Sequence, residues 1–272
     1  MTISNTVIIP DEINRKLKEY ARLIYEHNKT TNITGLKDTE SIYNELILGS
    51  ITPLKHVNVP RGTSFIDIGT GAGIPGIPLL LYFGGNIKGV LVDSNNKKIK
   101  FLLNAINTLG INDIVTVIQG RVEEIAKEKA YRDSFDFAVA RAFAHPLMAL
   151  EYGLPFVKPG GWLYIYYSFN LYEKGFENNK TVCSNDEVIA EYGCDKLHEE
   201  KNANKHDITV LTDYLTKHSL NLGGHRVTLE EAKKLKLYEG LIFLKDGYTP
   251  ANYPRKHAVV KREVESLRNI SS

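Results

Sequence analysis

The chain has few cysteines, scattered histidines and no long apolar run. Cys183 and Cys194 are the only cysteines among 272 residues, and their spacing matches no zinc or redox motif, so we expect free thiols in a reducing compartment. No stretch is apolar for long enough to span a bilayer. The first residues also lack the charged-then-apolar layout of a signal peptide. We therefore expect a cytoplasmic protein without a membrane anchor or a bound metal ion.

The chain also lacks a strong excess of charge of either sign. Its 34 lysines and arginines nearly balance 32 acidic residues, which gives a net charge of +2. This balance neither requires nor excludes a nucleic acid partner, so the distribution of charge along the chain matters more. The hydrophobic share of 43% is ample for a packed core, and the length fits one large domain or one domain with appendages.

The most informative segment is the run FIDIGTGAGIPGIP, which spans residues 65–78. Its first residues predict a buried strand that ends in an acid, Asp67. Glycines then alternate from Gly69 to Gly73, and they let the backbone turn sharply and approach a ligand without a Cβ in the way. A strand, glycine turn and helix in this order place a nucleoside ligand at the carboxyl edge of a parallel sheet.

Two interpretations of this loop remain open from its pattern. Residues 71–76 match the dinucleotide fingerprint G-x-G-x-x-G, and Asp93 follows where a ribose-binding acid is expected. The alternative is the D-x-G-x-G-x-G loop of S-adenosylmethionine (AdoMet) binding, from Asp67 to Gly73. An acid at the strand end suits the cationic sulfonium and would repel a diphosphate, so Asp67 favours AdoMet. The turn Lys158–Gly161 before another strand is typical of class I methyltransferases and points the same way.

The rest of the chain alternates strand and helix patterns. Helices between strands imply right-handed crossovers and a parallel sheet that is covered on both faces. We therefore expect an α/β, Rossmann-like class I AdoMet-dependent methyltransferase fold, with a mostly parallel seven-stranded sheet and an N-terminal helical extension. The expected strands are 64–68, 88–92, 114–118, 135–140, 162–167 and an antiparallel edge hairpin of 225–229 and 239–244, with helices at 75–83, 95–109, 121–129 and 144–153.

The sequence divides into three parts. Residues 1–57 form the helical extension, in which Asp11 is expected to cap one helix and Asp38 to begin a second. Residues 58–245 form the methyltransferase domain. It carries a polar insertion at about 169–220, and residues 246–272 form a basic C-terminal tail.

Polar residues follow the ends of the predicted strands, where a nucleoside ligand would bind. Asp93 ends the second strand and is suited to accept hydrogen bonds from both ribose hydroxyls, although capping of the next helix is an alternative role. After the third strand, the backbone from Gln119 to Glu124 is placed to meet the adenine edge, with Val122 on its face; an ordinary helix start is the alternative.

The loop after the fourth strand should face the methyl acceptor. Arg141 could contact a phosphate or the O6/N7 edge of guanine, and Phe143 could stack on a base. The alternatives are an ion pair of Arg141 with a nearby acid and a core position for Phe143. In the tail, Tyr253, Arg255 and Lys256 interleave aromatic and basic character, which suits RNA, although a solvated C-terminus would explain them too.

These motifs together resemble one family. The chain is similar to the glucose-inhibited division protein B family (GidB, or RsmG), the bacterial 16S rRNA guanine-N7 methyltransferases. The likeness covers roughly residues 15–167 and a short tail motif, and the glycine loop with its two prolines is its most specific part. The matching segments are Asn32–Thr34, Asp67–Pro78, Val92–Ser94, Lys97–Lys98, Phe101–Leu102, Arg121–Glu124, Arg141–Ala144, Pro159–Gly161 and Tyr253–Arg255.

The resemblance implies AdoMet as cofactor, small-subunit ribosomal RNA or the small ribosomal subunit as partner, and N7 of a guanine as the methylated atom. We expect a monomer. The predicted site residues are Arg141 as catalytic residue; Asp67, Gly69, Thr70, Gly71, Gly73, Ile74, Asp93, Ser94, Arg121, Val122, Glu123 and Arg141 for the cofactor; and Asn32, Arg141, Phe143, Tyr253, Arg255 and Lys256 for the substrate.

The chain departs from the family pattern in its second helix. Where the family carries an Arg-His pair and an Asp-Ser pair, this chain has the segment from Glu45 to Ser50, and Ser50 alone remains. Two alternatives therefore accompany the main prediction. One is a methyltransferase that acts on a small molecule or another RNA, and the other is a relative that binds AdoMet or RNA without catalysis.

Overall fold

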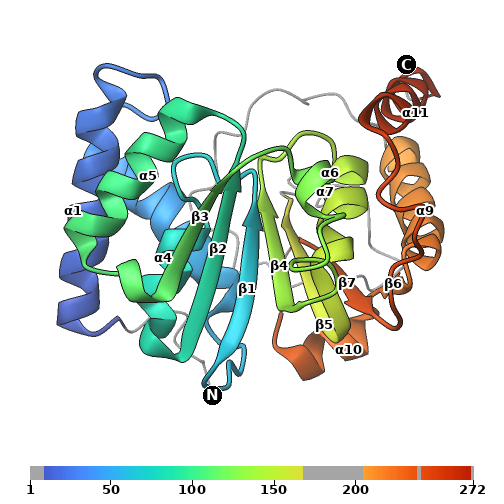
Figure 1. The fold of residues 1–272 in the computed structure, drawn as a ribbon, viewed down its shortest axis with the longest axis horizontal. Helices are drawn as coiled ribbons and strands as arrows, with labels where there is room; N and C mark the ends of the chain where they lie inside the picture. The colour runs from blue at the N-terminus through green and yellow to red at the C-terminus, as the bar shows by residue number, and fades with distance from the viewer. Residues whose placement is uncertain (1–8, 168–204, 238–239, 271–272) are drawn as a thin grey trace.

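The structure is a computed structural model that describes residues 9–167, 205–237 and 240–270. Seven strands form one sheet in the order β3-β2-β1-β4-β5-β7-β6 (Figure 1). The first five strands along the chain pair in parallel, and β7 runs antiparallel to both β5 and β6. This topology confirms the predicted Rossmann-like, mostly parallel sheet. The strands are β1 (Thr63–Ile68), β2 (Ile87–Asp93), β3 (Val115–Gln119), β4 (Phe135–Arg141), β5 (Val157–Tyr166), β6 (Gly224–Arg226) and β7 (Leu241–Lys245).

Helices lie on both sides of the sheet (Figure 1). One group consists of α1, α4 and α5, and the group on the opposite side contains α7, α9 and α11. The buried apolar residues form two hydrophobic clusters. Because strand side chains alternate between the faces of the sheet, neighbouring residues of β1 belong to different clusters: Phe65 to the first and Ile66 to the second. Together with α6 and α10, the helices have the bounds α1 (Asp11–Asn28), α4 (Gly76–Phe83), α5 (Asn96–Leu109), α6 (Val122–Ile125), α7 (Pro146–Gly153), α9 (Lys205–Asn221), α10 (Leu229–Leu235) and α11 (His257–Ile270).

The predicted N-terminal extension is helical. Its first helix, α1, buries Leu17, Tyr20 and Ile24 at helical spacing, as the apolar pattern requires. Asp11 lies in the first turn of α1 and Pro10 is the cap, so the expected capping role of Asp11 was wrong; Asp38 does cap the second helical segment. That segment consists of α2 (Thr39–Ser41), a π-helix η1 (Ile42–Leu48), α3 (Gly49–Ile51) and the 3-10 turn η2 (Thr52–Leu54).

Several boundaries differ from the prediction. The helix expected over 121–129 is the single turn α6. The first strand of the expected edge hairpin, 225–229, is the shorter β6, and α10 lies between it and β7. Of the predicted insertion, residues 168–204 lie outside the described residues, and the remainder belongs to α9. Among the described residues, no helix is both long and apolar enough to cross a membrane.

The predicted C-terminal tail folds onto the domain as α11. A fully buried carboxylate on α7, Glu151, accepts hydrogen bonds from the backbone and the guanidinium of Arg255 at 2.8 and 2.9 Å. His218 of α9 lies 2.5 Å from the same carboxylate. Burial alone would raise the pKa of Glu151, but the hydrogen bonds from His218 and Arg255 outweigh it and lower the pKa. The carboxylate is therefore charged, and it ties α9 and α11 to α7.

Replacing Glu151 with glutamine should lower the free energy of unfolding by about 3 kcal/mol, because it leaves the guanidinium of Arg255 without its buried carboxylate partner. Urea unfolding measures this change. Glu265→Gln is the control, since Glu265 is 57% exposed and pairs loosely with Lys261 at 4.0 Å; its effect should stay within about 0.5 kcal/mol. Equal effects of the two substitutions would contradict the anchoring role of Glu151.

Candidate functional site

The carboxyl ends of the parallel strands bring the predicted site residues to one edge of the sheet. Asp67 lies near the end of β1, Asp93 ends β2 and Arg141 ends β4. Because β1 pairs with both β2 and β4 in parallel, these three positions are neighbours along the edge. The loop after each strand therefore opens toward the same space, which is where ligands bind in sheets of this type.

Asp67 is a buried carboxylate at the centre of this edge. Its Oδ2 accepts hydrogen bonds from the Thr70 hydroxyl at 2.6 Å and from the Gly76 backbone N–H at 2.9 Å. Its Oδ1 is also buried and accepts none from any residue that the structure describes. Burial raises the pKa of Asp67 to about 7, against the lowering effect of those two hydrogen bonds. The site thus holds an acceptor oxygen that is ready for a donor from a ligand.

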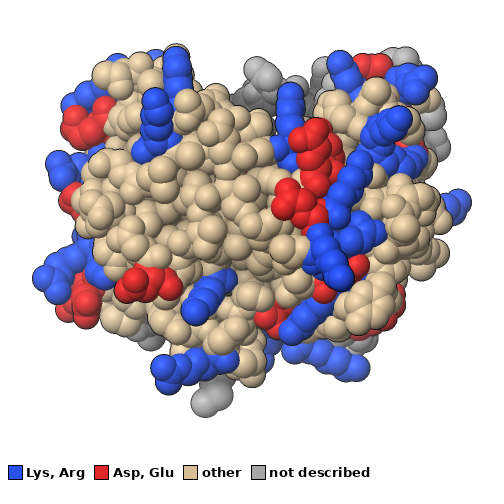
Figure 2. Space-filling view, viewed as in Figure 1, with Lys and Arg blue, Asp and Glu red and all other residues tan. Residues whose placement is uncertain are grey.

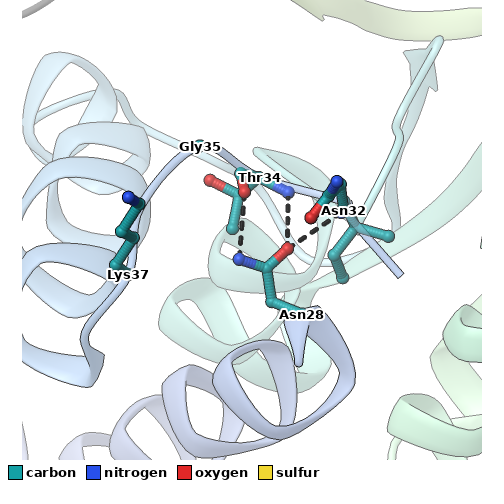
Figure 3. Close-up of a pocket in the computed structure, with 6 residues that line it drawn as sticks. Asn28, Asn32, Thr34, Gly35 and Lys37 are labelled. Atoms are coloured by element: carbon teal, nitrogen blue, oxygen red, sulfur yellow. Dashed lines mark hydrogen bonds between the residues drawn. The ribbon is translucent and has the colours of Figure 1, made fainter. Parts of the chain in front are cut away.

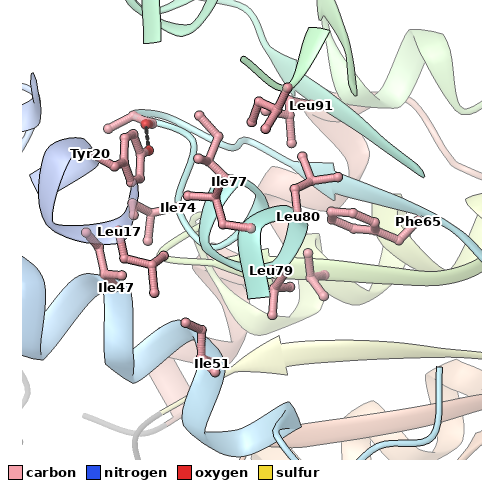
Figure 4. Packing of buried hydrophobic residues seen from close by; sticks show 14 of the residues in the cluster. Leu17, Tyr20, Ile47, Ile51, Phe65, Ile74, Ile77, Leu79, Leu80 and Leu91 are labelled. Atoms are coloured by element: carbon pink, nitrogen blue, oxygen red, sulfur yellow. Dashed lines mark hydrogen bonds between the residues drawn. The ribbon is translucent and has the colours of Figure 1, made fainter. Parts of the chain in front are cut away.

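The glycine-rich loop wraps around this carboxylate. Gly69 and Gly73 have φ values of +65° and +88°, which side chains disfavour. A Cβ on Gly73 would also lie 2.7 Å from the hydroxyl of Tyr20, so the close approach itself requires glycine. That hydroxyl belongs to α1 and donates a hydrogen bond to the carbonyl of Ala72 inside the loop (Figure 4). Ile74 and Leu80 continue into the core below.

Asp93 joins the glycine loop to the next helix. Its Oδ2 accepts from the Gly71 backbone N–H at 3.0 Å, and its Oδ1 accepts from the Asn95 N–H at 2.8 Å. Asn95, and not Asp93, is the side-chain cap of α5. Lys98 approaches Asp93 Oδ2 at 3.5 Å. A carboxylate has about four acceptor positions, so these contacts leave capacity for a ribose hydroxyl.

The remaining predicted cofactor residues flank this pair of acids. Ser94 and Arg121 are exposed at the ends of β2 and β3, with Arg121 at the cap position of α6. Val122 is 5% exposed and belongs to the second core cluster. Glu123 lies 3.7 Å from His257 of α11. The side chain of Val122 is thus already packed in the core, whereas Ser94 and Arg121 are open to the edge.

Phe143 lies directly over the start of the glycine loop. A Cβ on Gly69 would overlap the Phe143 ring, so the ring packs against the backbone of that glycine. Its two neighbours, Ala142 and Ala144, are both exposed and have φ values of +51° and +53°. Left-handed alanines cost about 1 kcal/mol each, and such strain concentrates at functional sites. Phe143 is half-buried, packs against the second hydrophobic cluster and meets the ring of Tyr152 edge-on, so the alternative of a core position holds in part.

Arg141 reaches the N-terminal extension. Its guanidinium donates to the carbonyls of Leu46 and Glu45 at 2.9 and 2.8 Å and to the Ser50 hydroxyl at 3.1 Å. It also lies 5.7 Å from the centre of the Tyr166 ring. These hydrogen bonds go to carbonyls and a hydroxyl, and the positive charge of Arg141 also acts to lower the pKa of Asp67, so Arg141 interacts with a nearby acid as well. This geometry makes Arg141 a link between β4 and the extension.

The loop that holds Asn32 forms a cavity of about 420 Å³ after α1 (Figure 3). Asn28 shapes it, because its side chain accepts from the N–H groups of Ile33 and Thr34 and donates to the carbonyl of Thr34. Asn32 is exposed at the rim. The loop is therefore held in shape from inside, and Asn32 is accessible, as its predicted role requires.

The predicted tail residues take different positions. Arg255 is bound to buried Glu151, and the carbonyl of Tyr253 accepts from Arg132 at 2.7 Å. Both therefore anchor the C-terminal segment, which the sequence prediction of RNA contact did not anticipate. Lys256 is exposed. On the face that Figure 2 shows, basic and acidic residues are mixed where the C-terminal helices lie. No continuous patch of one charge covers this face.

Sequence reasoning missed three residues of this edge: Tyr20, Ser50 as a partner of Arg141, and Tyr166. The Tyr166 hydroxyl donates to the Ser50 carbonyl at 2.6 Å across 116 residues of sequence. Their only local signal was burial, since Tyr20 falls on the apolar face of α1 and Tyr166 at the end of a strand. No spacing rule connects residues so far apart.

The residues at this edge fit AdoMet. The orphaned buried Oδ1 of Asp67 suits an ammonium group, and the glycine turn allows close approach of a ligand to the backbone. Asp93 ends the neighbouring strand as a ribose-binding acid should. A diphosphate would instead meet two carboxylates, so the dinucleotide interpretation fits less well.

Comparisons with known proteins agree with this geometry. Residues 13–204 match the family described as GidB, rRNA small subunit methyltransferase G. A protein named ribosomal RNA small subunit methyltransferase G from Moorella thermoacetica is 39% identical over 157 residues, which cover 58% of this chain and 64% of that protein. A protein of the same name from Alkaliphilus metalliredigens is 32% identical to this chain. The match covers 91% of this chain and 89% of that protein.

The match to the Moorella protein thus spans just under two thirds of that relative's length. Among solved structures, a SAM dependent methyltransferase from Aquifex aeolicus covers 50% of this chain and 70% of its own at 25% identity, with a TM-score of 0.40, too low to support an argument. The family match covers more than half of the chain. It confirms the predicted family and, with it, the class I AdoMet-dependent methyltransferase fold: the chain belongs to the GidB family of ribosomal RNA small subunit methyltransferases G.

Proposed function

We propose that this protein transfers the methyl group of AdoMet to N7 of a guanine in small-subunit ribosomal RNA. The observation that carries the proposal is the buried Asp67 carboxylate, which presents an orphaned oxygen inside a glycine-rich turn in a chain of this family. AdoMet supplies an electrophilic methyl group on a sulfonium. Ribosomal RNA as substrate and the cytoplasm as location follow from the family and are part of the proposal.

Each acid of the edge has a separate task in binding. Asp67 Oδ1 would accept a hydrogen bond from the ammonium group of AdoMet. The contacts of Oδ2 with Thr70 and Gly76 hold the carboxylate in the orientation that this requires. Asp93 accepts from ribose while it holds the Gly71 N–H. Backbone of the loop from Gln119 to Glu124 meets the adenine edge, and Ser94 and Arg121 flank it.

The acceptor side needs little proton chemistry. Guanine N7 carries a lone pair and no proton, so no residue has to act as a general base. The chain contributes orientation, which supplies several kcal/mol when reacting atoms are held in line. Phe143, whose ring packs against Gly69, is the candidate for stacking on the guanine. Exposed Asn32 and Lys256 are further candidate RNA contacts.

The direct test is methyl transfer from radiolabelled AdoMet to small-subunit RNA or subunits that lack the modification. We expect label that digestion releases as 7-methylguanine. Asp67→Ala should lower the rate by roughly a hundredfold at subsaturating AdoMet, since loss of a buried charged partner costs about 3 kcal/mol. AdoMet binding without label in RNA would turn the search to small molecules or other RNAs, and no AdoMet binding would refute the proposal.

AdoMet affinity should rise with pH through about 7. Burial raises the pKa of Asp67 to about 7 in the protein without ligand, and the cationic ligand prefers the ionised carboxylate. From pH 6 to pH 7 the ionised fraction grows about fivefold, so the Kd for AdoMet should fall by about that factor. Isothermal titration calorimetry across this range measures the change.

Asp67→Asn is the control for this pH dependence. It removes the protein carboxylate and keeps the titration of the ligand's own amino group, whose pKa is about 8. The variant should bind AdoMet more weakly and show no gain in affinity between pH 6 and 7. At saturating AdoMet the rate should stay flat above about pH 6, since the acceptor loses no proton; a steep rate profile would argue against guanine N7.

A further inference from the structure

One hydroxyl of the N-terminal extension donates a hydrogen bond to the cofactor loop. Tyr20 is fully buried on α1, and its hydroxyl donates to the carbonyl of Ala72 (Figure 4). Gly73, the next residue, has no room for a Cβ because the same hydroxyl would lie 2.7 Å from it. The tyrosine and the loop are therefore fitted to each other across 52 residues of sequence.

This contact acts on the part of the loop that faces the ligand. Ala72 lies between Gly71 and Gly73, whose φ values are +60° and +88°. Glycine linkages of this kind are flexible unless other contacts hold them. Asp93 holds the Gly71 N–H at 3.0 Å from the sheet side, and Tyr20 holds the Ala72 carbonyl from the extension. Tyr20 thus supplies a tether for the turn that does not come from the sheet.

A second contact joins the same extension to the acceptor side. Arg141, at the end of β4, donates to the carbonyls of Glu45 and Leu46, and Tyr166, at the end of β5, donates to the Ser50 carbonyl at 2.6 Å. Glu45 and Leu46 belong to the seven-residue π-helix η1. Such helices are rare and occur mostly at functional sites, because their wider turn changes where carbonyls point.

We propose that the N-terminal extension is a working part of the site, in which Tyr20 positions the cofactor loop and Tyr166, through Ser50, positions Arg141. This inference rests on the proposed function. The extension is bonded both to the loop after β1 and to the end of β4, which leads into the loop of Phe143, so it sets the separation of the two. In-line methyl transfer is sensitive to that separation, since a misplacement of about 1 Å can cost a hundredfold in rate.

A matched control separates positioning from stability. The hydroxyl of Tyr43 donates to Asn14 Oδ1 at 2.6 Å, within the extension and away from both loops. Tyr43→Phe therefore removes one half-buried hydroxyl contact within the extension without touching the cofactor loop. Melting temperatures of Tyr20→Phe, Tyr43→Phe and Tyr166→Phe, measured without ligand, show whether all three variants fold.

The first measurement is the Kd for AdoMet by calorimetry, which needs no RNA. Tyr20→Phe should raise the Kd about fivefold to tenfold, the effect of one lost hydrogen bond that organises the loop. Tyr43→Phe and Tyr166→Phe should stay within about twofold of wild type, because neither contacts the loop. An unchanged Kd in Tyr20→Phe, or an equal rise in Tyr43→Phe, would overturn the role of Tyr20.

The second measurement is the single-turnover rate on unmodified small subunits at saturating AdoMet. Tyr166→Phe should lower this rate at least tenfold while its Kd for AdoMet stays as in wild type, because positioning at the acceptor acts on the chemical step. A rate equal to that of Tyr43→Phe would overturn the role of Tyr166.

The proposed function and the role of the N-terminal extension would be overturned by different results. Absence of AdoMet binding by the wild-type protein would overturn the proposed function and this inference together. Wild-type binding and methyl transfer, combined with unchanged behaviour of Tyr20→Phe and Tyr166→Phe, would overturn the inference alone.

Discussion

The buried carboxylate of Asp67 is the interaction on which the rest of this edge depends. A charged group is costly to bury without partners, so the turn after β1 has to close around it. Thr70 and the first turn of α4, at Gly76, both donate to the same oxygen. A Cβ on Gly76 would lie 2.8 Å from that oxygen, so α4 begins at a glycine. The acid thus orders the loop, the helix start and the ligand side together.

Much of this arrangement was readable from the sequence because it is local. The continuous apolar runs placed β1 to β4 within one or two residues, and the glycine pattern marked the turn between β1 and α4. Strand alternation and apolar spacing act over a few residues, so a single sequence records them well. The same holds for α1, whose buried face followed from its spacing.

What the sequence did not reveal depends on contacts between distant segments. Arg141 was expected to contact RNA or a nearby acid, yet its partners include carbonyls 95 and 96 residues earlier. Arg255 looked like an RNA contact, and its partner is a buried acid on another helix. The π-helix η1 has no propensity signature, because a wide turn is set by its tertiary bonds. In each case the chemistry of the residue was clear and its partner was not.

The long-range contacts of the extension have a consequence for the order in which the chain folds. The extension is synthesised first, but its partners Arg141 and Tyr166 lie about a hundred residues later. Closing loops of that length is entropically costly and slow. During translation, α1 and η1 therefore emerge well before the strands they dock against, and the site is completed only after β5 has left the ribosome. A chain that stops before β5 would contain the whole glycine motif with its Tyr20 and Asp93 contacts and still lack the Tyr166 hydroxyl that holds Ser50.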